Sequence, residues 1–447
     1  RRGQLRCWRR VGGAHRTFFQ ESLRPRLYAG SRPLEWGCMH ETVVNTANET
    51  TQLDPRTDSA PARLDHALAP VRLGPLTVGT PVMLSPMAGV TNWPFRVLCE
   101  EYGSDGLYVA EMITARALVA RNPKALRLCR FAPSEHPRSL QLYGVNPAIV
   151  EQAARIVVDE SMADHVDLNF GCPVPKVTRR GGGSALPWKT DLLEEIIHRV
   201  VRVCEPAGIP VTAKFRVGID HDHETFLESG RIAQGEGCAA VTLHARTTAE
   251  YYGGHSDWTR IGELVEHLDI PVFGNGDIWG ADDAVAMVNE TGCAGVAIGR
   301  GCQGRPWIFA DIRNAFEGSD ARVRPTLGEV GAVVMRHARL LVEFFDGDER
   351  MAVHDLRKHI AWYLKGFPVG GSVRAAFMGC ESLAEVQAII DGLDQRAQLP
   401  ERIVDKPRGR VRFAKKVHLP YGWLESRRTT HAEREQLFGD DPMDAEY

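Results

Sequence analysis

Short apolar segments alternate with longer amphipathic segments from residue 82 to residue 301 of this chain. The apolar segments have the length of strands and cover residues 82–86, 105–112, 138–144, 165–171, 210–217, 239–247, 271–277 and 294–301. Helical spacing marks the residues 147–160, 192–205, 224–236, 259–267 and 281–290 between them. Eight strands that alternate with helices over about 240 residues predict an α/β fold of the (β/α)8 TIM-barrel type. A doubly wound open sheet is the alternative.

The strand alternation stops after residue 312, and helical spacing continues at 326–346, 349–366 and 383–393. We therefore expect a small C-terminal helical-bundle domain after the barrel. The predicted organisation has four parts: an N-terminal tail (1–66), the barrel with the catalytic site (67–315), the helical domain (325–400) and a C-terminal tail that is first basic and then acidic (401–447).

The N-terminal residues carry no strand or helix pattern. The chain begins with Arg, and residues 1–38 are rich in Arg and poor in acidic residues. A transit peptide has this composition, but we favour translated upstream sequence that is not native to the protein. Residues 39–66 are rich in Thr, Asn and Asp and are predicted to be disordered.

Composition limits the classes of protein this chain can belong to. With 43% hydrophobic and 25% charged residues among 447, it can bury a large core. The net charge of −3 gives no global field for nucleic acid, so any such contact must come from local patches. The ten cysteines form no CxxC pair, which indicates reduced, intracellular usage, and no metal site is predicted. No apolar run reaches a membrane-spanning length, and we expect a cytoplasmic protein.

Polar or special residues stand at the end of each predicted strand. They are Pro86 and Met87, Glu111 and Met112, Gln141, Asn169 and Cys172, Lys214 and Arg216, His244 and Arg246, Asn275 and Asp277, and Gly299 and Arg300. A barrel of this type carries its active site at the carboxyl ends of its strands. Any single residue of this set is as well explained by a loop hydrogen bond, but eight ends together predict a site.

The last two strands end in the Gly-rich loops 274–280 and 297–307. Such loops bring backbone N–H groups to an anion, and Arg300 can add charge-assisted bonds, so a phosphorylated ligand is predicted. Lys214 and Arg216 should point to one side of their strand and need an electron-rich partner, such as the pyrimidine edge of a flavin. A structural pair of Lys214 with Glu111 or Asp277 is the alternative. His244 is either a donor to the same ligand or a core histidine.

Cys172 lies where a strand gives way to a loop, between Gly171 and Pro173. It can be a buried structural thiol, a nucleophile or a proton donor. Its position and the Gly-rich loop 178–186 that follows, which could move, favour a chemical role.

Ordered motifs from Leu73 to Leu383 resemble the tRNA-dihydrouridine synthase family, and within it the bacterial B-type branch. The motifs are "SPMAGVTNWPFR" (85–96), "EM" (111–112), "QLYG" (141–144), "DLNFGCPVPKV" (167–177), "GGGSAL" (181–186), "AKFRVG" (213–218), "HARTTAEYYGGHSDW" (244–258), "GNGDI" (274–278), "IGRGCQGRPWIF" (298–309) and "RKHIAWYLKGFP" (357–368). Three positions depart from the family pattern: Ser85, Asn92 and Ala245.

The resemblance implies an FMN-dependent flavoprotein oxidoreductase that reduces the C5=C6 bond of specific uridines in tRNA with NADPH or NADH. Hydride would pass from flavin N5 to C6, with Cys172 as the proton donor to C5. It also implies that Pro86, Met87 and Ala88 line the flavin, that Gln141 and Lys214 contact its ring, and that His244 helps to hold it. The remaining cofactor contacts implied at the ribityl-phosphate end are Asn275, Gly276, Asp277, Gly299 and Arg300.

The tRNA needs contacts that compensate for turning a uridine out of its stack. Asn169, Lys176, Arg216 and Arg246 are predicted to hold the base or its phosphates. Candidates in the helical domain and beyond it are Arg357, Lys358, Lys365, Arg374 and the basic residues of 405–416. Expected partners are tRNA and NAD(P)H, with no DNA and no membrane, and we expect a monomer. Two alternatives are an FMN barrel that acts on a free pyrimidine, as dihydroorotate dehydrogenases do, and a non-catalytic RNA-binding protein.

Overall fold

The computed structural model describes residues 62–103, 105–408 and 416–439. All of them belong to one compact unit that begins at Arg56. The predictions for residues 1–61 lie outside the described residues. Residues 62–66, which we expected in a disordered lead-in, are among those described, and Ala62 and Leu64 pack against the barrel core.

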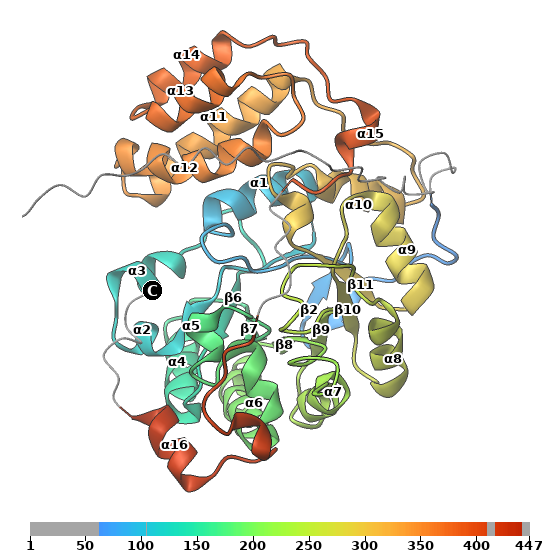
Figure 1. The fold of residues 1–447 in the computed structure, drawn as a ribbon, viewed down its shortest axis with the longest axis vertical. Coiled ribbons are helices and arrows are strands. Elements are labelled where there is room, and N and C mark those ends of the chain that lie inside the picture. Colours follow the sequence, from blue (N-terminus) through green and yellow to red (C-terminus); the bar gives the residue numbers. More distant parts are fainter. Residues whose placement is uncertain (1–61, 104, 409–415, 440–447) are drawn as a thin grey trace, which may run out of the picture. The chain divides into compact units, whose positions relative to one another are not determined.

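Nine parallel strands form the central sheet in the order β4-β3-β11-β10-β9-β8-β7-β6-β5 (Figure 1). Their bounds are β3 Val82–Leu84, β4 Leu107–Tyr108, β5 Ile113–Thr114, β6 Ser139–Tyr143, β7 His165–Phe170, β8 Val211–Arg216, β9 Ala240–His244, β10 Val272–Asn275 and β11 Gly295–Ile298. β4 and β5 belong to one irregular chain segment that pairs with β3 at its start and with β6 at its end, and Val109 bridges to Ser139 of β6. The ring is therefore a closed (β/α)8 barrel, as the alternation predicted, and not an open doubly wound sheet.

The strands are buried almost throughout, which explains their continuous apolar sequences. Helices cover the outside of the ring: α1 Trp93–Gly103, α4 Pro147–Asp159, α6 Thr190–Cys204, α7 Phe226–Gly235, α8 Thr259–His267, α9 Ala281–Thr291 and α10 Ile308–Phe316. The short helices α2 (Ala115–Val119) and α3 (Pro123–Leu128) follow β5. The helix α4 begins where its sequence predicts, since Asn146 accepts the N–H groups of Ala148 and Ile149 as an N-cap.

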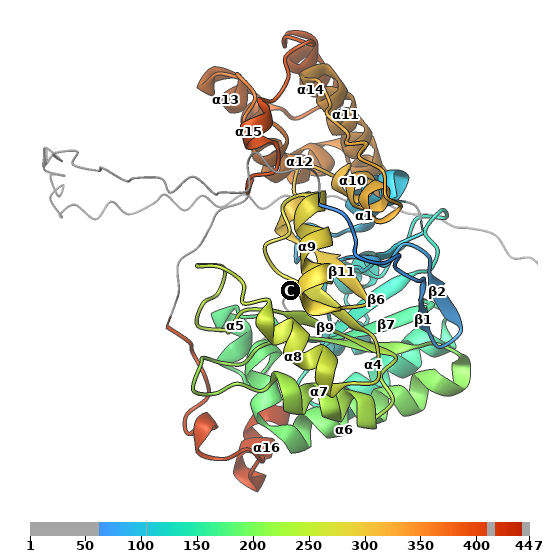
Figure 2. The same cartoon turned by 90° about the vertical axis from the view of Figure 1, so that its right-hand side faces the viewer.

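A hairpin of β1 (Val71–Leu73) and β2 (Leu76–Val78) packs on one end of the barrel interior. Figure 2 shows this hairpin and the short helix α5 (Pro175–Thr178) on opposite sides of the strands. The loops that follow the strands are consequently left on the side of α5, where they can form a site.

The helical domain after the barrel contains α11 Leu327–Phe344, α12 Glu349–Tyr363, α13 Gly371–Gly379 and α14 Leu383–Asp391. Thr326 with Glu329 and Ser382 with Glu385 form capping boxes that start α11 and α14. Their apolar faces share one core with residues of α1 and with Trp307 of the barrel. A polar contact also joins the barrel to the helical domain. The buried Arg408 donates to the carbonyl oxygen of Gly304 in the barrel and to that of Trp362 in α12.

Residues beyond 400 contain more structure than the predicted tail. A short helix α15 (Glu401–Val404) precedes Arg408, and the described residues 416–439 contain a 3-10 turn (Trp423–Glu425) and the helix α16 (His431–Phe438). Trp423 is 2% exposed, so this part of the chain is packed. None of the helices in the described part of the chain has the length and hydropathy needed to cross a membrane.

Candidate active site

A cavity of about 780 Å³ opens where the barrel strands end. All eleven residues predicted to hold a cofactor line it: Pro86, Met87, Ala88, Gln141, Lys214, His244, Asn275, Gly276, Asp277, Gly299 and Arg300. Cys172, Asn169 and Arg216 lie in the same lining, and α12 contributes Lys358, Ala361 and Trp362. The barrel thus brings residues from eight separated strand ends to one place, and the helical domain forms part of its wall.

Three residues predicted to contact the substrate do not line this cavity. Lys176 is exposed on α5, next to the loop of Cys172. Arg246 is buried and donates hydrogen bonds to Gly253, Gly254, Ser256 and Asp277. Arg357 donates to the carbonyl oxygen of Cys380 inside the helical domain.

The basic residues predicted after Lys358 are also engaged within the protein. Lys365 donates to the carbonyl oxygens of Pro407 and Arg408, and Arg374 donates to that of Leu364. Arg408 is buried, whereas the prediction for residues 409–415 lies outside the described residues. In the described structure, Lys358 is therefore the predicted tRNA contact of the helical domain that also faces the cavity.

Lys214 lies within β8 and reaches into the cavity, where its Nζ donates to Oδ1 of Asn275 at 2.9 Å. It pairs with this amide and not with Glu111 or Asp277, the partners we had considered. Burial, with a smaller contribution from Arg216, lowers the pKa of Lys214 to about 7. The lysine is therefore only about half protonated at neutral pH, although the charge of the nearby Asp167 favours its protonated form.

Arg216 points to the same side of β8 and joins two loops, the one after β7 and the one after β9. It donates to the carbonyl oxygens of Gly171, Thr247 and Tyr251, and its guanidinium lies 5.3 Å from the ring centre of Tyr252. The contact with Gly171 fixes the residue directly before Cys172.

Asp277 is the centre of the charged end of the cavity. Its carboxylate accepts from Arg246 at 2.7 Å and from Arg300 at 3.3 Å. The guanidinium of Arg300 lies between the rings of Tyr252 and Trp279, 4.9 Å from each ring centre. Burial, followed by repulsion from Arg246, lowers the pKa of Arg300 to about 10. Two guanidinium groups share one carboxylate here, so an anion would be favoured.

The glycine at 276 is required by the backbone. Gly276 has φ = +129°, and a Cβ atom there would lie 2.2 Å from Oγ of Ser256. A Cβ atom at Gly299 would instead project toward Ser85 and Met87 at 3.8–4.0 Å, and both residues line the cavity. These glycines leave room for a ligand to approach the two loops.

His244 is 9% exposed and surrounded by cations. Burial and then the charges of Arg216 and Lys214 place the pKa of His244 well below its ordinary value. The imidazole is therefore neutral at physiological pH and can both donate and accept a hydrogen bond.

Hydrogen bonds to its backbone N–H and carbonyl groups hold Cys172 in place. Oδ1 of Asn169 accepts the N–H groups of Gly171 and Cys172, each at 3.1 Å, so the chain turns sharply at the end of β7. The N–H and Oγ of Ser184 both donate to the carbonyl oxygen of Cys172 at 3.1 Å. Burial raises the pKa of the Cys172 thiol above its ordinary value. Of the eight cysteines in the described residues, Cys172 alone is partly exposed, and the other seven are buried.

A chain of buried side chains under the cavity was not predicted from the sequence. Asp167 accepts from Nε2 of Gln141 and from Oγ1 of Thr212, each at 2.6 Å, and Oε1 of Gln141 accepts from Asn169 at 2.9 Å. His165 continues the chain to Ser139. The available signal was the alternation of polar His165, Asp167 and Asn169 within an apolar strand. This chain fixes the amide orientations of Gln141 and Asn169.

The charges and polar groups of the cavity suit a flavin nucleotide. Its charged lining consists of four cations, Lys214, Arg216, Arg300 and Lys358, and one carboxylate, Asp277. Burial is the main cause of the depressed pKa values of Lys214 and Arg300, so an anionic ligand would favour their charged forms. The Gly-rich loops and Arg300 would hold the phosphate, and Gln141 with Lys214 would hold the ring. Among the described residues, no group of three or more His, Cys, Asp or Glu side chains is arranged for a metal ion.

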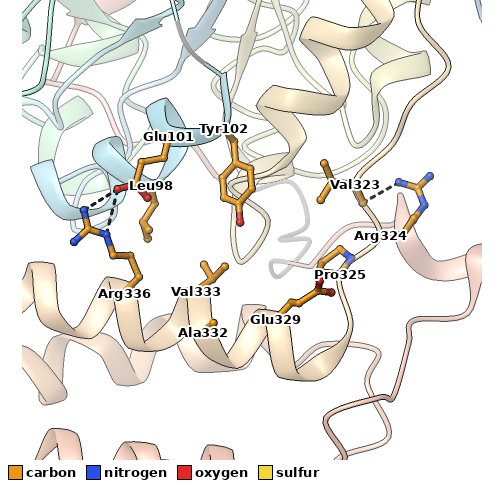
Figure 3. A pocket seen from close by; sticks show the side chains of 10 residues that line it. All are labelled: Leu98, Glu101, Tyr102, Val323, Arg324, Pro325, Glu329, Ala332, Val333 and Arg336. Atoms are coloured by element: carbon orange, nitrogen blue, oxygen red, sulfur yellow. Dashed lines mark hydrogen bonds and ion pairs between the residues drawn. The ribbon is translucent and has the colours of Figure 1, made fainter.

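A second cavity, of about 540 Å³, lies between α1 and the start of α11. Figure 3 shows Tyr102 and Val333 from its two sides and the ion pair of Arg336 with Glu101 at its edge. Arg324 is paired with Glu401. The predicted site residues are absent from the lining of this second cavity. The cavity at the strand ends is therefore the candidate active site.

Comparisons with known proteins point to one family. The profile of the family described as Dihydrouridine synthase (Dus) matches residues 83–398. A probable tRNA-dihydrouridine synthase of Mycobacterium tuberculosis is 51% identical over 361 residues, covering 79% of this chain and 92% of that protein. The tRNA-dihydrouridine synthase B of Pseudomonas putida is 37% identical over 314 residues, covering 70% of this chain and 91% of that protein.

Proposed function

Because this chain belongs to the dihydrouridine synthase family of tRNA-modifying enzymes, we propose that it reduces the C5=C6 bond of a uridine in tRNA to 5,6-dihydrouridine. We propose FMN as its bound cofactor and NADPH or NADH as the reductant. One observation carries this assignment: the free thiol of Cys172 lines the same cavity as a set of cationic and amide side chains that could hold a flavin.

The chemistry requires a hydride and a proton on the two adjacent carbons of the C5=C6 bond of the uracil ring. When bound, reduced FMN supplies the hydride to C6. Negative charge then builds at C5 and its neighbouring carbonyl, so a general acid must deliver a proton to C5. Sγ of Cys172 holds that proton, because the raised pKa keeps the thiol protonated at neutral pH.

The other cavity residues position the two partners. Asn169 sets the turn that aims Cys172, and its amide is bonded to Gln141, which we propose contacts the flavin ring. Lys214 supports the electron-rich edge of that ring, while Arg300 with the N–H groups of the Gly-rich loops binds the phosphate. Arg216 holds Gly171 and so keeps the acid in place.

The substrate reaches this cavity past the helical domain. Lys358 and Trp362 of α12 stand on the wall of the cavity, where a cation can contact a tRNA phosphate and an indole can contact a base. We propose that α12 guides a flipped uridine into the barrel mouth.

The direct test is mass spectrometry of unmodified tRNA incubated with the purified protein, FMN and NADPH. We expect a gain of two hydrogens on one uridine. Cys172→Ala should slow this reaction by about 10²-fold or more while flavin content and flavin reduction by NADPH stay unchanged, because the thiol acts only on the uracil. Serine at the same position is a matched control for size. Turnover of free uridine or orotate without tRNA would contradict the proposal and favour a small-molecule enzyme.

A further inference from the structure

Residues 416–439 form a strap that lies against α6 and against the loop that follows Cys172. Figure 1 shows α16 beside α6, and the ion pairs of Arg434 with Asp191 and Glu195 join the two helices. The strap lies beyond the residues matched by the family profile, which end at 398. The role we proposed for the cavity does not explain why this segment is held so closely.

Trp423 is the apolar anchor of the strap. Its indole is 2% exposed, and Nε1 donates to the carbonyl oxygen of Ala185 at 2.9 Å. The indole also lies over Gly181, where a Cβ atom would come within 2.6 Å of the ring. The Gly-rich segment 181–185 is therefore packed directly against this side chain.

Lys189 is the polar anchor. Its side chain is fully buried, and Nζ bonds to the carbonyl oxygens of Ser426 and Arg428 and to the carboxylate of Glu433 at 2.8 Å. All three acceptors come from the strap. The ammonium also lies 4.9 Å from the ring centre of Trp423, so the two anchors support each other.

The Gly-rich segment 181–185 also contacts Cys172. Ser184 donates two hydrogen bonds to the carbonyl oxygen of Cys172, and Ser184 is adjacent to Ala185, which accepts from Trp423. A Cβ atom at Gly183 would lie 2.4 Å from that same carbonyl oxygen. Ala185, which the strap contacts, is therefore the neighbour of Ser184, and Ser184 is hydrogen-bonded to the thiol-bearing residue Cys172.

We propose that the strap is a positioning element for the proton-transfer step, with Trp423 and Lys189 as positioning residues that fix the carbonyl group of Cys172 through Ser184. This proposal rests on the function proposed above. No residue of the strap (416–439) is among those that line the cavity, so the strap should leave flavin binding and flavin reduction unaffected.

The test compares Trp423→Ala and the milder Trp423→Phe with Tyr421→Ala, a control at a fully exposed position of the same strap. We expect the single-turnover rate of tRNA reduction to fall about 10- to 100-fold in Trp423→Ala, because misplacing a reacting group by an ångström has an effect of that order. In steady-state kinetics the loss should appear mainly in kcat and not in KM. Flavin content and the rate of flavin reduction by NADPH should stay within about twofold of the unmodified protein. Equal losses in both half-reactions would overturn the proposal.

A second readout does not depend on the enzymatic reaction. Alkylation of Cys172 by iodoacetamide, followed by peptide mass spectrometry in the holoenzyme, should change several-fold in Trp423→Ala and stay constant in Tyr421→Ala. An unchanged alkylation rate overturns the positioning role even when the protein reduces tRNA. Altered alkylation in a protein that never reduces tRNA would instead refute the proposed function alone. Trp423→Phe, which removes the N–H donor but keeps a ring, covers the case in which the alanine variant does not fold.

Discussion

Lys214 lies in a buried region of the barrel, where the amide oxygen of Asn275 accepts its hydrogen bond and the charges of Arg216 and Asp167 act on it in opposite directions. Burial lowers its pKa to about 7, so at pH 8 only about one lysine in ten is charged in the empty protein. An electron-rich ring edge placed against Nζ would favour the charged form and raise this pKa again.

We therefore predict that FMN binding to the apoprotein at pH 8 takes up nearly one proton. Calorimetry in two buffers of different ionisation enthalpy measures this uptake. Lys214→Met should abolish it, whereas Lys358→Met, which removes an exposed lysine of the same cavity, should not. Equal uptake in both variants would show that Lys214 does not face the flavin.

The position of a residue in the cavity could be predicted from the sequence where the residue type is unusual for its place. A lysine and a cysteine at the ends of apolar strands are of this kind, and both line the cavity. Arg246 and Arg216 were both predicted to contact the substrate, but only Arg216 lines the cavity. Arg246 instead donates to the loop at 253–256. Asp167 was missed because its partners, Gln141 and Thr212, lie on neighbouring strands, and that adjacency follows only from the barrel register.

Among the elements, α11 and α12 contain an unusual buried contact. His337 and His359 are fully buried with ring centres 4.5 Å apart. Within the described structure, Nε2 of His337 and both ring nitrogens of His359 lack a hydrogen-bond partner. Burial lowers the pKa of His337 to about 3 and that of His359 well below its ordinary value, with Lys358 contributing to both.

The buried pair of His337 and His359 should make the folded protein less stable in acid. Between pH 6.5 and about 3 the unfolded chain binds protons that the folded chain excludes, so the free energy of unfolding falls as the pH falls. At pH 5 each of these two buried histidines should reduce the free energy of unfolding by about 2 kcal/mol relative to pH 8. His359→Leu should remove one such contribution in urea titrations. His354→Leu, at an exposed position of the same helix, should leave the pH dependence unchanged.

Elements were predictable from sequence where local periodicity was strong. The eight strands and the helices α4, α6, α8, α9, α11 and α12 were found within a few residues. The helix α13 was missed because its glycines weaken the helical signal. The strap was expected to be a tail, since its order comes from Trp423 and Arg434, whose partners are more than two hundred residues away along the chain.

For the whole molecule, Arg408 adds a buried polar contact to the hydrophobic core that the barrel and the helical domain share. The buried guanidinium joins Gly304 of a barrel loop to Trp362 at the end of α12. Gly304 has φ = +67°, and a Cβ atom there would lie 2.4 Å from the carbonyl carbon of Trp362, so the two backbones are in direct contact. Closure of the ring through β4 and β5 and this contact with α12 were not predictable from local patterns, because both join distant segments.

Arg408→Ala should therefore loosen the wall that α12 provides to the cavity. We expect the free energy of unfolding to fall by about 2–3 kcal/mol, because hydrogen bonds from a charged donor are lost, and KM for tRNA to rise several-fold with flavin content unchanged. Denaturant titration and steady-state kinetics measure the two effects. Arg402→Ala, at an exposed position of α15, is the matched control, and a similar rise of KM in this variant would contradict the prediction.

The strap also has a consequence for how the protein is made. The ribosome completes the barrel, with Cys172 and the Gly-rich loops, long before it adds Trp423. A nascent or prematurely terminated chain that ends before Trp423 therefore lacks the support that we propose aims the thiol. Where such a chain binds the proposed flavin, we expect it to take hydride from NAD(P)H and pass the electrons to dissolved oxygen, which is reduced to hydrogen peroxide, instead of to tRNA.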